Sequence, residues 1–210
     1  GEPFAFWEDH YTQDYAVANT IRHHTWCGWQ LGQPRAYLWG IPYERTFKQK
    51  LKLKARYFAW NLFFANAFNP SAKTMTRLAH LIRKRKPKLL HGYASALYVF
   101  AQFVQENGWD DVKLSAVYST SGVLYPSQRE YIEETFECEV FNRYATQEVS
   151  GIACECEQHT GMHISTETNY VEILDEDYMP VEPGEAGSVV VTNLTNYVFP
   201  FIRYRQDDFA

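Results

Sequence analysis

Several features that would assign a chain to a class at once are missing from this sequence. No apolar run approaches the ~20 residues that a membrane-spanning helix needs. No secretory leader is visible, and there is no internal repeat or low-complexity segment. The four cysteines, Cys27, Cys138, Cys154 and Cys156, are too scattered for a disulfide framework. We therefore expect a cytoplasmic protein that neither spans a membrane nor depends on disulfides.

A surplus of positive charge is also missing. Lys and Arg together number 20 against 25 Asp and Glu, which gives a net charge of −5. This balance argues against a general nucleic-acid binder and against binding to a bilayer surface. Hydrophobic residues make up 46% of the 210 positions, which is ample for the core of one large domain.

Neither end of the chain resembles a natural terminus. The sequence has no initial Met, opens on Gly1-Glu2-Pro3 and stops at Asp207-Asp208-Phe209-Ala210, directly after a strand-like run. We expect an internal fragment, whose apolar docking surfaces would favour aggregation or a homodimer.

The first sixty-odd residues alternate between helical and strand-like segments. Residues 5–24 predict an amphipathic helix, because Trp7, Tyr11, Tyr15 and Ala18 recur at spacings near four. We expect this aromatic stripe to face the core. A strand at 35–40, a basic helix at 45–60 and a short strand at 62–65 follow.

The segment from Ser71 to Phe141 reads as three helices that alternate with three strands. Such alternation predicts an α/β fold, with a mostly parallel sheet and covering helices. Ligands bind at the carboxyl ends of the strands in these sheets. The turns at Ser121-Gly122-Val123 and Tyr144-Ala145-Thr146 are therefore expected to meet around one ligand.

The pattern changes to strands after Glu148. Residues 162–165, 170–174, 188–193 and 198–204 are strand-like, with no long helix between them. We predict two parts, an α/β nucleotide-binding part at 1–150 and a β-rich subdomain at 151–210.

The stretch from Asn142 to Glu148 combines side chains that suit a nucleotide. Tyr144 offers a flat face to a base, Ala145 lets the backbone approach closely, and Thr146 offers a hydroxyl to a phosphate oxygen. Glu148 offers a hard oxygen ligand to magnesium. The alternative is a strand followed by an ordinary polar loop, because short motifs often arise by chance.

A second set of candidate ligands lies downstream. Cys154, Cys156, His159 and His163 supply thiolates and imidazoles in close sequence, with Cys138 upstream. These are the ligands of structural zinc sites. The alternative is a set of ordinary free cysteines, since Cys-x-Cys is looser than Cys-x-x-Cys and buried free cysteines are common.

Several segments, in order, resemble adenylate-forming enzymes of the phenylacetate–CoA ligase branch. Residues 142–148 resemble that family's Y-G-[ST]-x-E segment, residues 184–188 its G-E-x-G-E-L-V turn, and residues 203–208 its R-Y-R-T-G-D segment. Residues 36–40 and 91–97 are most similar to the branch linked to capsular polysaccharide biosynthesis. The resemblance covers nearly the whole chain and implies the central part of the family's N-terminal domain.

The resemblance implies a two-step ligase. A carboxylic acid attacks the α-phosphate of Mg-ATP to give an acyl-adenylate and pyrophosphate, and the thiol of coenzyme A then displaces AMP. It further implies that Tyr144 stacks on the adenine, that Thr146 meets the α-phosphate, and that Glu148 holds magnesium. Asp208 would accept hydrogen bonds from the ribose. The remaining residues of the nucleotide site would be Ser121, Gly122 and Val123, which flank the adenine, with Asn142 and Ala145.

The acid pocket is less well defined by the resemblance. Trp39, His91, Gly92 and Tyr93 sit at predicted strand ends and could line it. Trp39 and Tyr93 are equally compatible with an ordinary core.

Departures from the family pattern leave alternatives open. Ala145 stands where the family has Gly, and Gln206-Asp207 stand where it has Thr-Gly. Gly1-Glu2-Pro3 resemble only the tail of the family's phosphate loop, and the lid domain with its catalytic lysine is missing, so we expect the fragment itself to be inactive. The alternatives are a non-catalytic nucleotide-binding homologue, or an enzyme that passes the acyl or adenylyl group to an acceptor other than coenzyme A.

Overall fold

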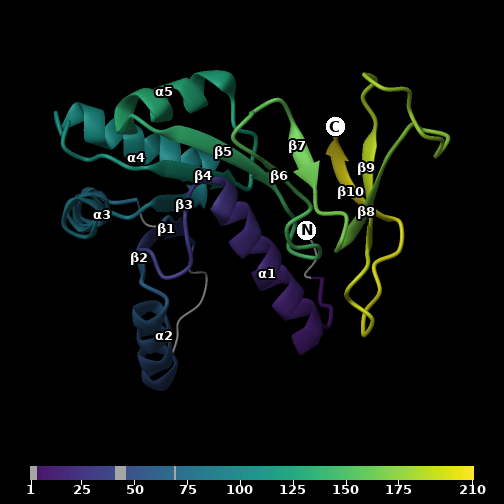
Figure 1. The fold of residues 1–210 in the computed structure, drawn as a ribbon, viewed down its shortest axis with the longest axis horizontal. Coiled ribbons are helices and arrows are strands. Elements are labelled where there is room, and N and C mark those ends of the chain that lie inside the picture. Colours follow the sequence, from purple (N-terminus) through teal and green to yellow (C-terminus); the bar gives the residue numbers. More distant parts are fainter. Residues whose placement is uncertain (1–3, 41–45, 69) are drawn as a thin grey trace.

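The computed structural model describes residues 4–40, 46–68 and 70–210, and confirms the predicted α/β fold (Figure 1). The resemblance at Gly1-Glu2-Pro3 and the predicted helix start at residue 45 lie outside the described residues. The elements in chain order are α1 (His10–Trp26), β1 (Arg35–Trp39), α2 (Phe47–Ala59), β2 (Leu62–Asn66), α3 (Ala72–Arg85), β3 (Leu89–Tyr93), α4 (Ala94–Glu106), β4 (Ala116–Thr120), α5 (Pro126–Phe136), β5 (Glu139–Tyr144), β6 (Ala153–Glu155), β7 (Met162–Ile164), β8 (Asn169–Leu174), β9 (Ser188–Asn193) and β10 (Tyr204–Phe209).

The main sheet has seven strands in the order β2-β1-β3-β4-β5-β6-β7. The pairs among β1 to β5 are parallel, and β6 and β7 extend the sheet in antiparallel pairing. Helices α3, α4 and α5 lie on one side of the sheet and α1 crosses the other (Figure 1). All five residues of β4 are buried, as expected of a central strand covered on both faces.

A second, antiparallel sheet has the order β10-β9-β8. A small core that includes Val149, Ile152, Val191 and Phe201 joins it to the α/β part. Strands β6 and β7 belong to the main sheet although they follow residue 150, and the separate sheet starts at Asn169. The two-part division of the chain at residue 150 stays a prediction.

The expected inward stripe on the first helix is wrong. The helix begins at His10 and not at residue 5, so Trp7 precedes it and is 77% exposed, and Tyr11 and Tyr15 are exposed as well. The residues that α1 buries are polar: Thr12, Asn19, His23 and His24. Local spacing located the helix but not its inner face, because partners distant in sequence satisfy these polar groups.

Two strand expectations also need correction. Residues 198–203 form no strand, since Phe201 packs into the small core instead, and β10 begins only at Tyr204. Strand β5 runs on through Tyr144, because β6 supplies antiparallel partners to its last two residues. Tyr144 therefore sits at the end of a strand and not in a loop.

Among the described helices, none is long and apolar enough to cross a membrane.

Candidate active site

A cavity of about 630 Å³ lies between the carboxyl end of the main sheet and the small sheet. Its walls come from the turn after β4, the end of β5, the β6–β7 hairpin and the small sheet. All seven residues expected around the nucleotide line this single cavity: Ser121, Gly122, Val123, Asn142, Tyr144, Ala145 and Asp208.

The turn after β4 has an unusual backbone. Ser121 and Gly122 both have positive φ, at +54° and +106°. A non-glycine residue in this region is strained, and such strain tends to collect at ligand sites. The turn directs the chain into the cavity before Pro126 opens α5, and leaves Val123 exposed there.

Tyr144 and Asp208 join the two sheets across the cavity. The Tyr144 hydroxyl donates a hydrogen bond of 2.8 Å to Oδ2 of Asp208, although the residues lie 64 positions apart. Burial, together with this hydrogen bond to the carboxylate, raises the pKa of Tyr144 above its usual value. The phenol therefore stays protonated and acts as a donor at neutral pH.

Both departures from the family motifs fit the backbone. Ala145 is not among the residues with positive φ, so a side chain in place of Gly is tolerated. Asp207 has a φ of +57°, a conformation that Gly favours and that Asp tolerates better than most residues. Asp208 consequently reaches the cavity despite the changed neighbours.

Thr146 and Glu148 lie outside the residues that line the cavity. The Thr146 hydroxyl accepts a hydrogen bond of 3.1 Å from the Val149 backbone and keeps its own proton to donate. The half-buried Glu148 borders a small hollow with Glu8 and Thr12. Within the described part of the chain its carboxylate forms no hydrogen bond or ion pair.

The residues expected in the acid pocket gather as aromatic packing on the α1 side of the sheet. The Trp39 ring lies 4.4 Å from Tyr93 and 5.2 Å from His91, measured between centroids. None of the three lines the 630 Å³ cavity. Gly92 has a packing reason to be Gly, since a Cβ there would lie 3.0 Å from the Leu38 carbonyl oxygen.

His91 differs from the other members of this group because it carries two buried polar nitrogens. It is 4% exposed, and neither of its buried ring nitrogens has a hydrogen-bond partner among the described residues. Burial, reinforced by His24 and by the Arg143 and Arg35 guanidiniums, holds the pKa of His91 well below its usual value. The imidazole is therefore neutral at physiological pH.

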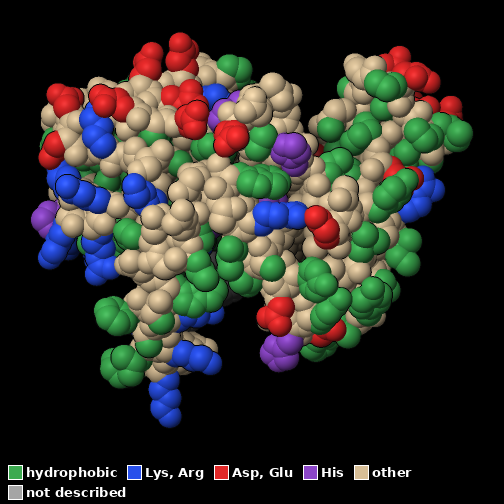
Figure 2. Space-filling model, viewed as in Figure 1, with side chains coloured by type: hydrophobic (Ala, Val, Ile, Leu, Met, Phe, Trp, Pro, Cys, Tyr) green, Lys and Arg blue, Asp and Glu red, His purple; other side chains and the backbone are tan. Residues whose placement is uncertain are grey.

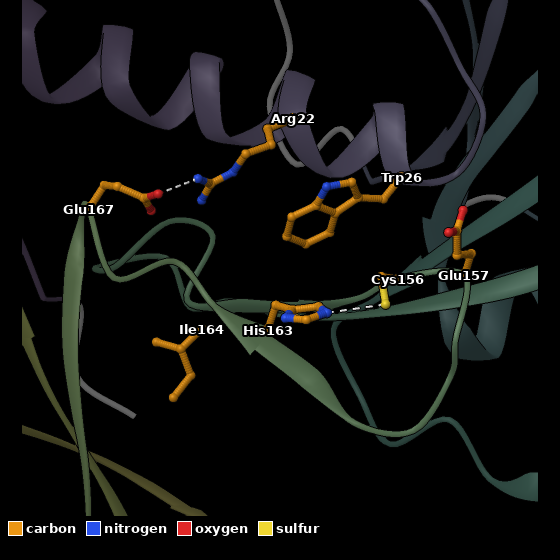
Figure 3. Close-up of a pocket in the computed structure, with 7 residues that line it drawn as sticks. All are labelled: Arg22, Trp26, Cys156, Glu157, His163, Ile164 and Glu167. Carbon is orange, nitrogen blue, oxygen red and sulfur yellow. Dashed lines mark hydrogen bonds and ion pairs between the residues drawn. The ribbon is translucent and has the colours of Figure 1, made fainter.

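Two of the four expected zinc ligands meet in a separate pocket of about 430 Å³ (Figure 3). Nε2 of His163 lies 3.1 Å from Sγ of Cys156. Arg22 and Trp26 of α1 form the opposite wall, and Arg22 pairs with Glu167 at 2.7 Å (Figure 3).

The other two expected ligands lie elsewhere. Cys154 is fully buried in the core under α1, while His159 lies 3.3 Å from Glu155, which is also bound by Arg129. Among the described residues no three His, Cys, Asp or Glu side chains are grouped to hold a metal. The expectation of one four-ligand zinc site is therefore corrected. The Cys154 thiol is packed in the core, and His159 lies with Arg129 and Glu155 in a different pocket from Cys156 and His163.

Two parts of the site are not signalled by any sequence pattern. The far wall of the cavity comes from Val171, Ile173 and Val189 of the small sheet, whose strand pattern does not reveal that the sheet faces the nucleotide turns. The second part is a buried polar network on α1. Asn19 donates to the Gly151 carbonyl at 2.8 Å, and His23 contacts the Tyr118 hydroxyl at 3.2 Å and the Ser165 hydroxyl at 3.1 Å.

Comparisons with known proteins confirm the fold and the resemblance. No family model matches the chain. Protein CapK of Staphylococcus aureus is 24% identical over 166 residues, which are 77% of this chain and 35% of CapK. Phenylacetate-coenzyme A ligase of Thermus thermophilus is 27% identical over 138 residues, which are 63% of this chain and 31% of that enzyme.

A solved structure of 2-hydroxyisobutyryl-CoA ligase, in complex with 2-HIB-AMP and CoA, superposes over 100% of this chain and 45% of its own. Its TM-score is 0.77 at 21% identity. The fold is therefore that of adenylate-forming enzymes. Within that class, the chain is similar to phenylacetate–CoA ligase-like proteins, and it spans about a third of the length of the curated relatives it matches.

Proposed function

We propose that this chain is the nucleotide-binding part of a ligase that activates a carboxylic acid with ATP and passes the acyl group to coenzyme A. One observation carries the proposal. Three segments that lie far apart in the sequence, around Ser121, Tyr144 and Asp208, bring all seven expected nucleotide-site residues to one cavity. Chance grouping is a poor explanation when the segments come from two different sheets.

The proposed roles follow from the chemistry of the side chains. The Tyr144 ring offers its face to the adenine, while its hydroxyl holds the Asp208 carboxylate in place. Asp208 has further lone pairs to accept the ribose hydroxyls. The free proton of the Thr146 hydroxyl would go to an oxygen of the α-phosphate. These contacts position the phosphate for in-line attack by the acid.

Glu148 is the residue that would hold magnesium. Magnesium needs only one or two protein carboxylates, because water and substrate phosphates complete its shell. A half-buried carboxylate without a hydrogen bond or ion pair to any described residue fits this need. When bound, the ion would neutralise charge that develops on the phosphates.

For the carboxylic acid substrate we propose a binding region and not individual contacts. We propose that Trp39, His91, Gly92 and Tyr93 lie behind its acyl group, a location supported by their aromatic grouping at the ends of β1 and β3. The similarity to CapK supports the capsule-linked branch of the family. ATP and coenzyme A as substrates make the cytoplasm the proposed compartment.

The test is pyrophosphate release by the full-length protein with a panel of carboxylic acids. Glu148→Gln keeps the size of the side chain and removes its charge, so we expect the adenylation rate to fall at least ~10²-fold, with little change in melting temperature. Glu157→Gln, at an exposed position, is the matched control and should adenylate normally.

The outcomes separate the alternatives. Release that also yields a thioester identifies a CoA ligase, and release without dependence on coenzyme A identifies another acceptor. No release with any acid would favour a non-catalytic nucleotide-binding homologue. A Glu148→Gln protein that melts early but adenylates normally would refute the magnesium role. We do not expect the 210-residue chain alone to form a thioester, because it spans so little of its relatives.

A further inference from the structure

Helix α2 is strongly basic, as is α3, whose fourteen residues also carry five cations and no acid; α2 differs from α3 because its apolar side chains are exposed. Its thirteen residues, Phe-Lys-Gln-Lys-Leu-Lys-Leu-Lys-Ala-Arg-Tyr-Phe-Ala, carry five cations and no acid, whereas the chain as a whole has a net charge of −5. Figure 2 shows basic and hydrophobic side chains together on the arm that α2 forms below the body of the molecule. The net negative charge of the chain is therefore compatible with a strongly basic helix.

The apolar side chains of α2 form an exposed stripe. Phe47 is 81% exposed, Leu51 60% and Phe58 84%. At 100° per residue these three lie within an arc of roughly 40° on the helix surface. By the same geometry Lys50 and Lys54 border the stripe on one side, while Lys48, Lys52 and Arg56 lie farther round the helix, toward its opposite face.

Among the described residues, the main contact between α2 and the body of the protein is made by β2. The Tyr57 ring stacks on Phe64 of β2 with centroids 5.9 Å apart, and a capping box of Thr46 and Gln49 fixes the first turn. No residue of the helix is buried. Helices of this length are marginal in water without a packed face, so the exposed stripe is the surface on which a partner would stabilise α2.

We propose that α2 binds the surface of a membrane that contains anionic lipid. An apolar stripe bordered by lysine, with further cations on the rest of the helix surface, is the pattern of a helix that lies in the interface, with Phe and Leu at the acyl boundary and lysines at the headgroups. A nucleic acid would be met by cations at the centre of the contact, where α2 has Phe47, Leu51 and Phe58. The proposal does not depend on the ligase activity.

The arrangement of the molecule is compatible with this docking. The arm formed by α2 and the small sheet lie on opposite sides of the molecule (Figure 1). A protein attached through α2 therefore keeps the 630 Å³ cavity open to solvent. Outside α2 and α3 the chain is acidic and is repelled by an anionic surface. Helix α3 buries its apolar side chains in the core and therefore has no apolar stripe to insert.

The test is co-sedimentation of the 210-residue chain with vesicles of phosphatidylglycerol and phosphatidylcholine in equal amounts. We expect binding to these vesicles, weaker binding at high salt, and little binding to phosphatidylcholine alone. Lys50→Glu/Lys54→Glu should weaken binding at least about 25-fold, from about fivefold for each lysine lost. Phe47→Ser/Phe58→Ser should weaken it at least about tenfold.

The matched control is Lys73→Glu/Arg77→Glu on α3, which makes the same change in charge at two exposed positions one turn apart. It should bind almost as the unchanged protein does. Circular dichroism should show that all variants stay folded; Lys50→Gln/Lys54→Gln replaces the charge reversal if that variant unfolds.

Three results would overturn the proposal. One is no binding of the unchanged chain to the anionic vesicles. Another is an equal loss in the α3 control, which would mean a general charge effect. The third is a lipid-free dimer that Phe47→Ser/Phe58→Ser dissociates, since a second copy of the chain would then cover the stripe.

Discussion

His91 shows how one buried residue can set the acid sensitivity of the fold. Its ring packs against Tyr118 and Tyr37, with centroids 4.7 and 4.6 Å away, and neither nitrogen has a hydrogen-bond partner within the part of the chain that the structure describes. Its pKa is depressed in the folded state, so the unfolded chain binds its proton first as the pH falls below about 6.5. Stability contributed by the neutral ring is therefore lost from about pH 6.5 downward.

We predict that His91→Phe stabilises the fold and reduces this loss. A phenyl ring suits the aromatic surroundings and removes an unsatisfied polar group, which is worth about 1 kcal/mol in the free energy of unfolding at pH 7. The gain should be larger at pH 5, where only the wild-type residue takes up a proton on unfolding. Urea unfolding at both pH values is the measurement. His80→Phe, at an exposed position, is the control, and an equal pH dependence in the wild type and His91→Phe would contradict the account.

The neighbouring His23 is buried as well but fully bonded. Burial, with smaller effects from Arg143 and Arg22, lowers the pKa of His23 to about 3. The Ser165 hydroxyl donates to Asn19 at 3.1 Å, which leaves its oxygen to accept from Nε2 of His23. Nδ1 then accepts from the Tyr118 hydroxyl. His23 and His91 thus illustrate two ways in which a buried imidazole is kept neutral.

Helix α3 provides a prediction about the termination of an element. Its C-cap, Lys86, has a left-handed backbone with φ of +45°, and the Lys86 amide donates to the Ile82 carbonyl at 2.8 Å. Gly adopts this conformation without steric cost. Lys86→Gly should therefore raise the free energy of unfolding by about 0.5–1 kcal/mol.

The matched control lies in the same helix. Lys84→Gly removes the same side chain from a helical position, where Gly costs about 1 kcal/mol relative to good helix formers. Chemical denaturation of both variants should give shifts of opposite sign. A comparable loss of stability in both would show that the strain at Lys86 is not significant.

At the scale of the whole molecule, the position of the cavity means that a bound ligand would contact both sheets. Ser121 and Tyr144 approach it from the main sheet, and Asp208 approaches from β10. We predict that AMP raises the melting temperature of the chain, because a ligand at 100 times its Kd adds about 2.7 kcal/mol to the stability of the bound state.

Hydrogen exchange locates this effect. Amides of residues 121–124 and of β10 should both exchange more slowly with AMP present. Asp208→Ala should remove the increase in melting temperature, while Asp177→Ala, the same change at an exposed turn of the small sheet, should preserve it. Protection restricted to one of the two sheets would show that the nucleotide does not bridge them.

The sequence by itself determined the elements and the local chemistry of the nucleotide site. The alternation of helical and strand-like segments is enough to predict a parallel sheet with covering helices. A strand covered on both faces is a short continuous apolar run, and a covering helix carries apolar residues at helical spacing. The residues around Tyr144 and Ser121 could be predicted as nucleotide-site residues, because strand ends and turns are recognisable from the local sequence. The fit of Asp207 in place of Gly is also local, as it depends on one backbone angle.

Only the tertiary structure decided which distant groups meet. The inner face of α1 can be polar because Gly151, Tyr118 and Ser165 form hydrogen bonds with its side chains. The sequence of the helix alone does not predict these partners. The same holds for Asp208, whose partner Tyr144 lies on another sheet. It also holds for the four expected zinc ligands, which lie in the core, in the 430 Å³ pocket and beside Glu155. Whether residues from distant segments form a hydrogen bond or a shared binding site depends on the register of the strands and on which faces of the elements pack together. Both are set by the packing of the whole chain.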